Sequence, residues 1–172
     1  MKKEIIFDIK KIRILSVILT ILIAFILVLI RLNIERPVFY FSIRWYMVIY
    51  IVFIVFAHEG LHGIGFRYIG KSPWENISYG IHRKYLTPYC VCRDSIMTKR
   101  QYLGVLLLPN IILSSITLII MIKSYNLTWT LLATFVIVSG IGDYYMTIEV
   151  VKCPHETRFK DHPTEPGFYI YY

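Results

Sequence analysis

The sequence contains few cysteines and few charged residues for its length. Its 172 residues include three cysteines, an odd number that excludes a disulfide framework, so we expect reduced thiols. Charged residues make up 17% of the chain and hydrophobic residues 56%, with a mean hydropathy of +0.58. The length suits one domain, but this composition is too apolar for an ordinary soluble protein. We therefore expect an integral membrane protein.

The first apolar run also lacks the small-residue cleavage pattern of a signal peptide. It is long and ends at Arg31, so we interpret it as a retained membrane anchor. Four apolar segments are near the length that crosses about 30 Å of hydrocarbon, at about 14–30, 43–69, 102–122 and 127–151. The expected fold class is an all-α polytopic membrane protein with four transmembrane helices, formed by residues 1–172 as a single domain.

A polar loop at 70–101 separates the second segment from the third. Two strand-like pieces lie within it, Asn76 to Ile81 and Leu86 to Cys92, and together they predict a small cytoplasmic β-hairpin. The cytoplasmic tail at 152–172 is polar and aromatic, and its last residues could lie as a strand against that hairpin. The short link between the third and fourth segments predicts that these two helices are adjacent and antiparallel.

Lysine and arginine are unevenly distributed along the chain. Of the 19 such residues, five precede the first segment, seven lie between Arg67 and Gln101 and three lie in the tail, against four elsewhere. The positive-inside rule then predicts that both termini are cytoplasmic in a multi-pass protein of the cell membrane. Because the basic residues flank apolar segments and no nucleic-acid-binding module is recognisable, we expect no nucleic-acid partner.

The most informative motif is His58-Glu59-Gly60-Leu61-His62, in the second apolar segment. On a helix, residues four apart lie on one face, so His58 and His62 can share one metal ion. Glu59, next to the first histidine, can reach a water molecule bound to that ion. The glycines around the motif let a neighbouring helix approach closely, and we interpret them as a packing face: Gly60, Gly63 and Gly65.

A third ligand is predicted from the few ionisable groups in the other apolar segments. Asp143 lies sixteen residues past Leu127, and His58 lies fifteen past Ile43, so both sit about 22–24 Å along helices that run inward. Glu149 is a poorer candidate because it lies about 9 Å further along and about 120° away on the helix. The alternative for the whole cluster is a buried salt bridge that holds helices together.

Two histidines and one aspartate would leave one coordination position of Zn²⁺ for water, whose pKa the metal lowers toward ~7. Glu59 would take a proton from this water as it attacks a peptide carbonyl and pass it to the leaving amine. The predicted reaction is hydrolysis of peptide bonds in membrane-embedded or membrane-adjacent protein substrates. The single domain would then be an integral membrane metallopeptidase.

Several motifs resemble those of known membrane zinc proteases. His58-Glu59-x-x-His62, Pro109-Asn110 and Gly142-Asp143 on successive apolar segments resemble the site-2-type intramembrane zinc proteases. More closely, the chain resembles the DUF3267 family of membrane zincin peptidases. The residues that carry this second resemblance are Tyr89-Cys90-x-Cys92, Gln101-Tyr102, Ser139-Gly140, Asp161-His162-Pro163 and Gly167-Phe168, together with the motif at 58–62, Pro109 and Gly142-Asp143.

The resemblance implies zinc ligation by His58, His62 and Asp143, with Glu59 as catalytic base. By analogy with site-2 proteases, Asn110 would hold the substrate backbone, although the Gly-Pro-rich pattern around that residue is absent. The Leu-Asp-Gly order of site-2 proteases is not reproduced either, because Gly142 precedes the aspartate and a tyrosine follows it. A polar residue that bridges helices near a proline kink is an equally good interpretation of Asn110.

Two other readings of the chain remain open. A non-enzymatic membrane protein could keep the metal site for structure, sensing or metal handling, although such a site has no need of a base beside its first histidine. A metal-free helical scaffold would contain no stoichiometric zinc.

Cys90 and Cys92 are interpreted as part of a half-buried strand, and His162 as a loop residue that the resemblance alone connects to the site. The substrate, the oligomeric state and the pathway are not predicted.

Overall fold

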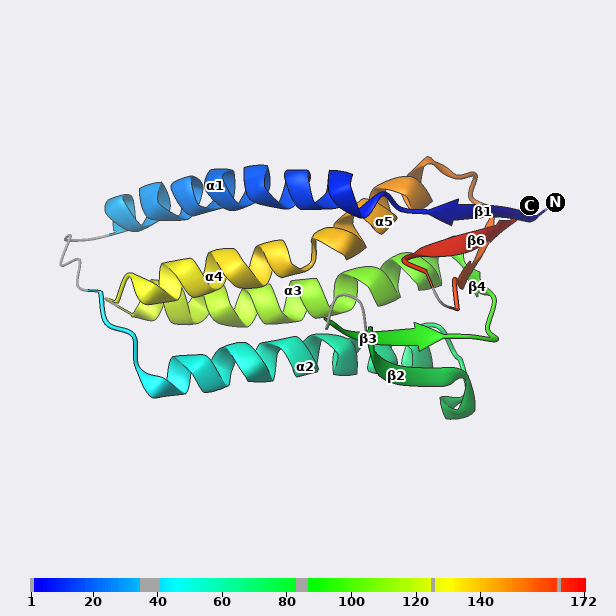
Figure 1. Cartoon of the computed structure of the whole chain (residues 1–172), viewed down its shortest axis with the longest axis horizontal. Coiled ribbons are helices and arrows are strands. Elements are labelled where there is room, and N and C mark those ends of the chain that lie inside the picture. Colours follow the sequence, from blue (N-terminus) through cyan, green and yellow to red (C-terminus); the bar gives the residue numbers. More distant parts are fainter. Residues whose placement is uncertain (1, 35–40, 83–86, 125, 164) are drawn as a thin grey trace.

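The computed structural model describes residues 2–34, 41–82, 87–124, 126–163 and 165–172. The chain is mostly helical, and its longer helices lie side by side as a bundle with the strands gathered at one end (Figure 1). The helices are α1 (Ile9–Ile34), α2 (Trp45–Tyr68), α3 (Lys99–Lys123), α4 (Thr128–Ser139) and α5 (Ile141–Lys152), with a 3-10 turn η1 (Trp74–Asn76).

Three of these helices are long and apolar enough to cross a membrane: α1, α2 and α3. The pair α4 and α5 meets the same criteria together but is bent by 41°, so the chain has three candidate spans, or four if the bent pair counts as one. This indicates a membrane protein. The predicted segment at 127–151 is therefore not one straight helix, because the α-helical conformation is interrupted at Gly140, with φ −81° and ψ 14°.

The start of α3 is set by a local capping motif. Thr98 accepts a hydrogen bond from the backbone N–H of Gln101, and the Gln101 side chain accepts one from the backbone N–H of Thr98. Such a capping box satisfies two of the free donors at a helix start. It explains why α3 begins at Lys99, three residues before the predicted segment.

The strands are β1 (Lys2–Ile6), β2 (Ile77–His82), β3 (Thr87–Cys92), β4 (Met97–Thr98), β5 (Arg158–Asp161) and β6 (Gly167–Tyr171). β2 and β3 pair antiparallel as a separate two-stranded sheet between α2 and α3, each starting one residue after the predicted piece. Most of the connection predicted between them, at 82–85, lies outside the described residues.

A second sheet, of four strands in the order β1-β6-β5-β4, was not predicted. The tail strand β6 pairs with β1 and β5 rather than with the hairpin, so the prediction of its partner was wrong. Aromatic packing accounts for this arrangement, because the rings of Phe159 and Phe168 are fully buried against Tyr102 of α3, with centroids 5.5 and 5.7 Å from its ring.

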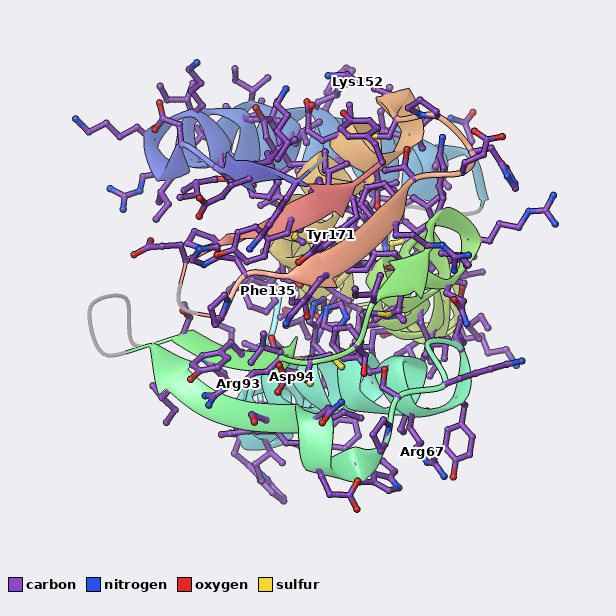
Figure 2. All side chains as sticks on the ribbon, turned by 90° about the vertical axis from the view of Figure 1, so that its right-hand side faces the viewer. Arg67, Arg93, Asp94, Phe135, Lys152 and Tyr171 are labelled. Atoms are coloured by element: carbon purple, nitrogen blue, oxygen red, sulfur yellow. The ribbon has the colours of Figure 1, made fainter. Side chains whose placement is uncertain are left out.

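The three segments that hold most of the basic residues lie at the same end of the helix bundle. β1, the hairpin and the tail strand β6 all lie there, and so do both chain termini (Figure 1). Figure 2 looks onto this end and shows the labelled basic side chains Arg67, Arg93 and Lys152 distributed around it. The fold thus brings together segments that the charge count predicts on one side of a membrane.

Candidate metal centre

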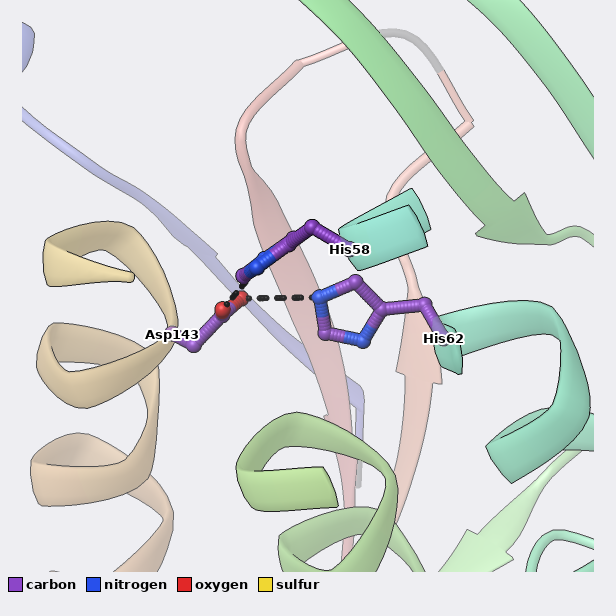
Figure 3. A group of neighbouring side chains, drawn as sticks. All are labelled: His58, His62 and Asp143. Atoms are coloured by element: carbon purple, nitrogen blue, oxygen red, sulfur yellow. Dashed lines mark hydrogen bonds and ion pairs between the residues drawn. The ribbon is translucent and has the colours of Figure 1, made fainter. Parts of the chain in front are cut away.

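Two histidines of α2 meet one aspartate of α5 inside the bundle (Figure 3). The Nε2 atom of His58 lies 3.0 Å from Oδ2 of Asp143, and the Nε2 atom of His62 lies 3.3 Å from Oδ1. One ligand atom from each of the three residues lies within 4.8 Å of the others. The residues predicted as ligands from two separate segments are therefore neighbours in space.

Local geometry sets the orientation of the two imidazoles. His58 and His62 are one helical turn apart, and their rings meet edge to face with centroids 4.9 Å apart. Asp143 is in the first turn of α5, directly after the break at Gly140, and points from that turn toward both rings (Figure 3). The three side chains are largely buried, with exposed fractions of 13%, 9% and 14%.

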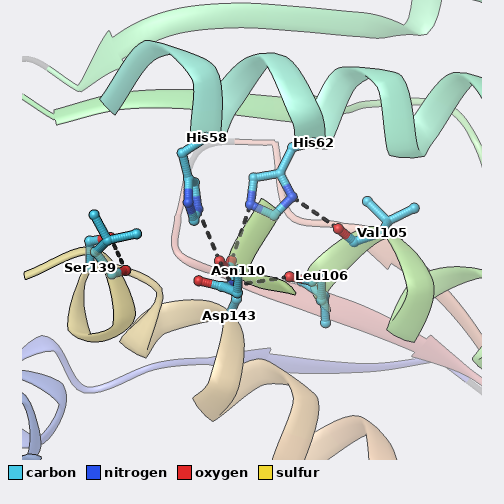
Figure 4. A network of polar contacts seen from close by, with 8 residues as sticks. His58, His62, Val105, Leu106, Asn110, Ser139 and Asp143 are labelled. Atoms are coloured by element: carbon cyan, nitrogen blue, oxygen red, sulfur yellow. Dashed lines mark hydrogen bonds and ion pairs between the residues drawn. The ribbon is translucent and has the colours of Figure 1, made fainter. Parts of the chain in front are cut away.

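Two groups of α3 contact the side chains of His62 and Asp143 (Figure 4). The Nδ1 atom of His62 lies 3.2 Å from the backbone carbonyl oxygen of Val105 in α3. The side-chain amide of Asn110 donates to Oδ2 of Asp143 at 2.8 Å and to the carbonyl oxygen of Leu106 at 3.3 Å. Such outer partners orient ligands at metal sites and set the histidine tautomer.

This donor set fits a zinc ion. Two imidazole nitrogens and one carboxylate are ligands that Zn²⁺ uses at catalytic sites, where a fourth position stays open. The far ring nitrogen of His62 is already engaged by a carbonyl group, which leaves Nε2 for a metal ion. A metal-free ion pair would show the same His–Asp contacts, so metal content is the measurement that separates the two interpretations.

Glu59 is half-buried and is not one of the three clustered ligand residues. It is close enough to His58, His62 and Asp143 to interact with their charges, and it faces Cys90 of the hairpin strand β3. Glu59 thus lies beside the ligand cluster, and its role as general base remains a prediction.

Asn110 has a different environment from the one expected of a substrate-binding residue. Its side chain is 3% exposed, and it contacts Asp143. The alternative interpretation, a polar residue that bridges helices beside Pro109, describes the observed contact, because Asn110 joins α3 to α5. Its predicted role in holding the substrate backbone remains a prediction.

The residues that the sequence left undecided lie apart from the three ligand residues. Glu149 pairs with Lys152 at 2.6 Å. Cys90 and Cys92 are free thiols in the half-buried strand β3, and burial raises the pKa of the Cys90 thiol well above its ordinary value. The Nε2 atom of His162, directly after β5, lies 2.8 Å from Oε1 of Glu4 in β1, so this contact joins β1 to the segment that follows β5.

Two residues near the centre were missed in the sequence. Val105 contributes a backbone carbonyl, for which the side-chain type carries no signal. Tyr79 of β2 covers α2 one residue after His62, because a Cβ atom at Gly63 would lie 1.7 Å from its hydroxyl oxygen.

The packing face predicted for the three glycines around the motif is only partly present. Gly63 and Gly65 face neighbouring elements, whereas a Cβ at Gly60 would meet nothing within 4 Å, so Gly60 is not part of a packing face.

Comparison with protein families places the chain in a known family. The family model DUF3267, described as "Putative zincin peptidase", matches residues 51–158, which is more than half of the chain. The matched range contains both histidines, the glutamate between them, Asn110 and Asp143. No curated protein and no solved structure matches the chain.

Proposed function

Because the chain belongs to the DUF3267 family of zincin peptidases, we propose that it is an integral membrane zinc metalloprotease. Its substrates would be proteins embedded in the bilayer or adjacent to it. His58, His62 and Asp143 would hold the zinc ion, and Glu59 would be the general base. This proposal is narrower than the family description, which names neither a membrane reaction nor a substrate.

The observation that carries the proposal is the meeting of three ligand atoms within 4.8 Å of one another, beside a carboxylate outside the cluster. A purely structural zinc site usually closes its fourth position with a protein ligand. The described residues supply only three clustered ligand side chains here, which favours a catalytic arrangement.

The chemistry follows from the roles of these groups. When bound, zinc would polarise the scissile carbonyl and lower the pKa of a water molecule. Glu59 removes the proton from the attacking water and then donates it to the amine that leaves, so the same carboxylate acts first as base and then as acid. Asp143, held by the amide of Asn110, keeps its orientation throughout.

We place the protein in the cell membrane with both termini in the cytoplasm. The uneven distribution of basic residues supports this orientation, because β1, the hairpin and the tail share one end of the bundle (Figure 1). The centre would then lie in the cytoplasmic half of the bilayer. A helical substrate would have to unwind there, because its carbonyls are otherwise hydrogen-bonded within the helix.

The hairpin of β2 and β3 is our candidate for holding the unwound substrate. It forms a sheet of its own, and Tyr79 places it against α2 directly beside the histidine motif. An extended peptide can add to the edge of such a sheet through main-chain hydrogen bonds. Substrate recognition of this kind would depend little on side-chain sequence near the cleaved bond.

The decisive experiment measures zinc and cleavage in the same samples. We expect the parent protein, purified in detergent, to contain stoichiometric zinc by elemental analysis and to cleave synthetic single-span transmembrane peptides. Glu59→Gln should retain the zinc and lose cleavage by roughly 10²-fold or more, because the amide cannot accept the proton. His58→Ala should lose both.

Each contrary result has its own meaning. Absence of zinc from the parent would leave a metal-free scaffold. Zinc retained with no cleavage by the parent would favour a non-enzymatic metal site for structure, sensing or metal handling. Cleavage by Glu59→Gln at the parental rate would exclude Glu59 as the base.

A further inference from the structure

Pro109 and Asn110 are consecutive residues in the middle of α3, and each is connected to a different predicted ligand. We infer that this dipeptide is a positioning device for the metal centre: Pro109 frees the carbonyl that orients His62, and Asn110 orients Asp143. The inference rests on the proposed function, since it concerns the same zinc site, and it assigns Asn110 to ligand positioning instead of substrate binding.

The first step concerns the backbone of α3. In a regular α-helix the N–H of each residue donates to the carbonyl oxygen four residues earlier, so the partner of Val105 would be the N–H of residue 109. Proline has no N–H. The Val105 carbonyl therefore lacks its usual helical donor, and the Nδ1 atom of His62 lies 3.2 Å from its oxygen.

The second step concerns the imidazole of His62. A carbonyl oxygen can only accept a hydrogen bond, so Nδ1 of His62 must carry the proton in this contact. In the neutral ring, Nε2 is then left with its lone pair, which a metal ion would accept; without a metal, a proton on Nε2 satisfies the carboxylate of Asp143 at 3.3 Å. Pro109 thus selects the tautomer of His62 that presents Nε2 to a metal ion.

The close approach of α2 to α3 makes this contact possible. A Cβ atom at Gly65 would lie 3.3 Å from the Cα atom of Val105, tighter than an ordinary contact. Small residues at such crossings let helix backbones approach in a membrane. The imidazole of His62 can therefore reach the main chain of the neighbouring helix.

The third step concerns Asn110. Both hydrogens of its amide are directed to acceptors, one to Asp143 at 2.8 Å and one to the Leu106 carbonyl at 3.3 Å. Its Oδ1 atom is buried against Gly140, where a Cβ would lie only 1.6 Å away. Both donors are used, and the acceptor Oδ1 is buried without a hydrogen-bond partner among the described residues. The 3% exposed side chain of Asn110 is therefore not accessible to a peptide backbone.

Zinc affinity of the full-length protein in detergent tests both arms of this inference. Pro109→Ala restores an N–H that competes for the Val105 carbonyl, and Asn110→Ala removes the donor to Asp143. Each should weaken the affinity for Zn²⁺, measured by competition with a chelator, by about 10-fold or more. Should Asn110→Ala fail to fold, Gly140→Ala displaces the same amide from the opposite side.

Two further measurements separate positioning from a structural role. Proline is unfavourable inside a helix, so the zinc-free Pro109→Ala protein should be no less heat-stable than the parent although it binds zinc more weakly. Nitrogen NMR of the zinc-loaded protein with labelled histidine should show the Nδ1–H resonance of His62 shifted by its hydrogen bond to the Val105 carbonyl in the parent and in Asn110→Ala, and less shifted in Pro109→Ala.

Thr117→Ala provides the matched control on α3. Its buried hydroxyl contacts the hydroxyl of Tyr50 at 2.6 Å, two turns beyond Asn110, so its loss should lower heat stability and leave zinc affinity unchanged. Parental zinc affinity in both Pro109→Ala and Asn110→Ala would overturn the inference and leave the proposed function intact. A parent protein that binds no zinc would instead overturn the proposed function.

Discussion

Three side chains contact the carboxylate of Asp143, and one glycine leaves room for the third of them. His58, His62 and Asn110 all lie within hydrogen-bonding or ion-pair distance of its carboxylate. Asn110 can take its place only because residue 140, at the break between α4 and α5, has no side chain. A second glycine two residues later, Gly142, has open space around its Cα instead.

This difference predicts opposite effects for two alanine substitutions. In Gly140→Ala the new methyl group would lie 1.6 Å from Oδ1 of Asn110, so the amide must move away from Asp143. We expect a loss of about 1–3 kcal/mol of stability, as for other overpacked sites, and zinc affinity lowered by about 10-fold. Thermal unfolding and chelator competition in detergent measure the two effects.

Gly142→Ala is the matched control for this prediction. A Cβ atom there meets nothing within 4 Å, and alanine is a better helix former than glycine by about 1 kcal/mol. The variant should be at least as stable as the parent, with the same zinc affinity. Equal effects of the two substitutions would show that the contact between Asn110 and Gly140 is unimportant.

Among the strands and helices, β5 is joined to two other elements by one buried carboxylate. Asp161 accepts a hydrogen bond from the backbone N–H of Cys92 in β3 at 2.9 Å and another from the hydroxyl of Tyr102 in α3 at 2.6 Å. Burial raises the pKa of Asp161 to about 6, and the two donors offset only part of this increase. The carboxyl group is thus protonated in the folded protein at pH values where it would ionise in the unfolded chain.

The raised pKa predicts a pH dependence of stability with a definite sign. The folded state binds the proton more tightly, so the contribution of Asp161 is fully present below about pH 4 and is lost as the pH rises through about 6. The change is up to about 3 kcal/mol at ~1.4 kcal/mol per pKa unit. We expect the melting temperature of the parent to fall relative to that of Asp161→Asn between pH 4 and 6.

Parent and Asp161→Asn share all their other titrating groups. The difference between their melting temperatures therefore reports the titration of Asp161 alone. Above about pH 7 the difference in melting temperature should become constant. A difference that grew in favour of the parent with rising pH would mean that the hydrogen bonds from Cys92 and Tyr102 outweigh the cost of burying the charge.

At the scale of the whole molecule, the candidate metal centre joins helices that are distant in sequence. His58 and His62 are on α2, Asp143 is on α5, and the chain between them forms the hairpin, α3 and α4. A metal ion held by both helices would bind the folded chain and not the unfolded one, and so stabilise the fold by mass action. The stabilisation depends on zinc concentration and requires ligands from both helices.

This coupling predicts how zinc changes thermal unfolding. Zinc at 100 times its dissociation constant should stabilise the parent by about 2.7 kcal/mol, and a chelator should reverse the effect. Asp143→Ala leaves α2 intact and should lose most of this stabilisation. Scanning calorimetry with and without Zn²⁺ measures it, and an equal zinc-dependent rise in Asp143→Ala would place the binding elsewhere in the chain.

The sequence by itself determined those features that depend on residues close together along the chain. The apolar segments, the i, i+4 pair His58 and His62, and the two strand pieces of the hairpin all follow from short-range periodicity, which a single element expresses without its neighbours. Matching depths along two helices also pointed from His58 to Asp143, because the helical rise per residue is constant.

Tertiary structure alone decided the features that depend on contacts between distant segments. The four-stranded sheet joins residues near both termini, and its pairing follows from burial of Phe159 and Phe168 against Tyr102. The break at Gly140 and the contact of His62 with the Val105 carbonyl likewise depend on how α2, α3 and α5 pack. The chain contains the residues for these contacts, but no local pattern predicts their partners. The partners depend on which arrangement of the whole chain buries the most apolar surface at close packing.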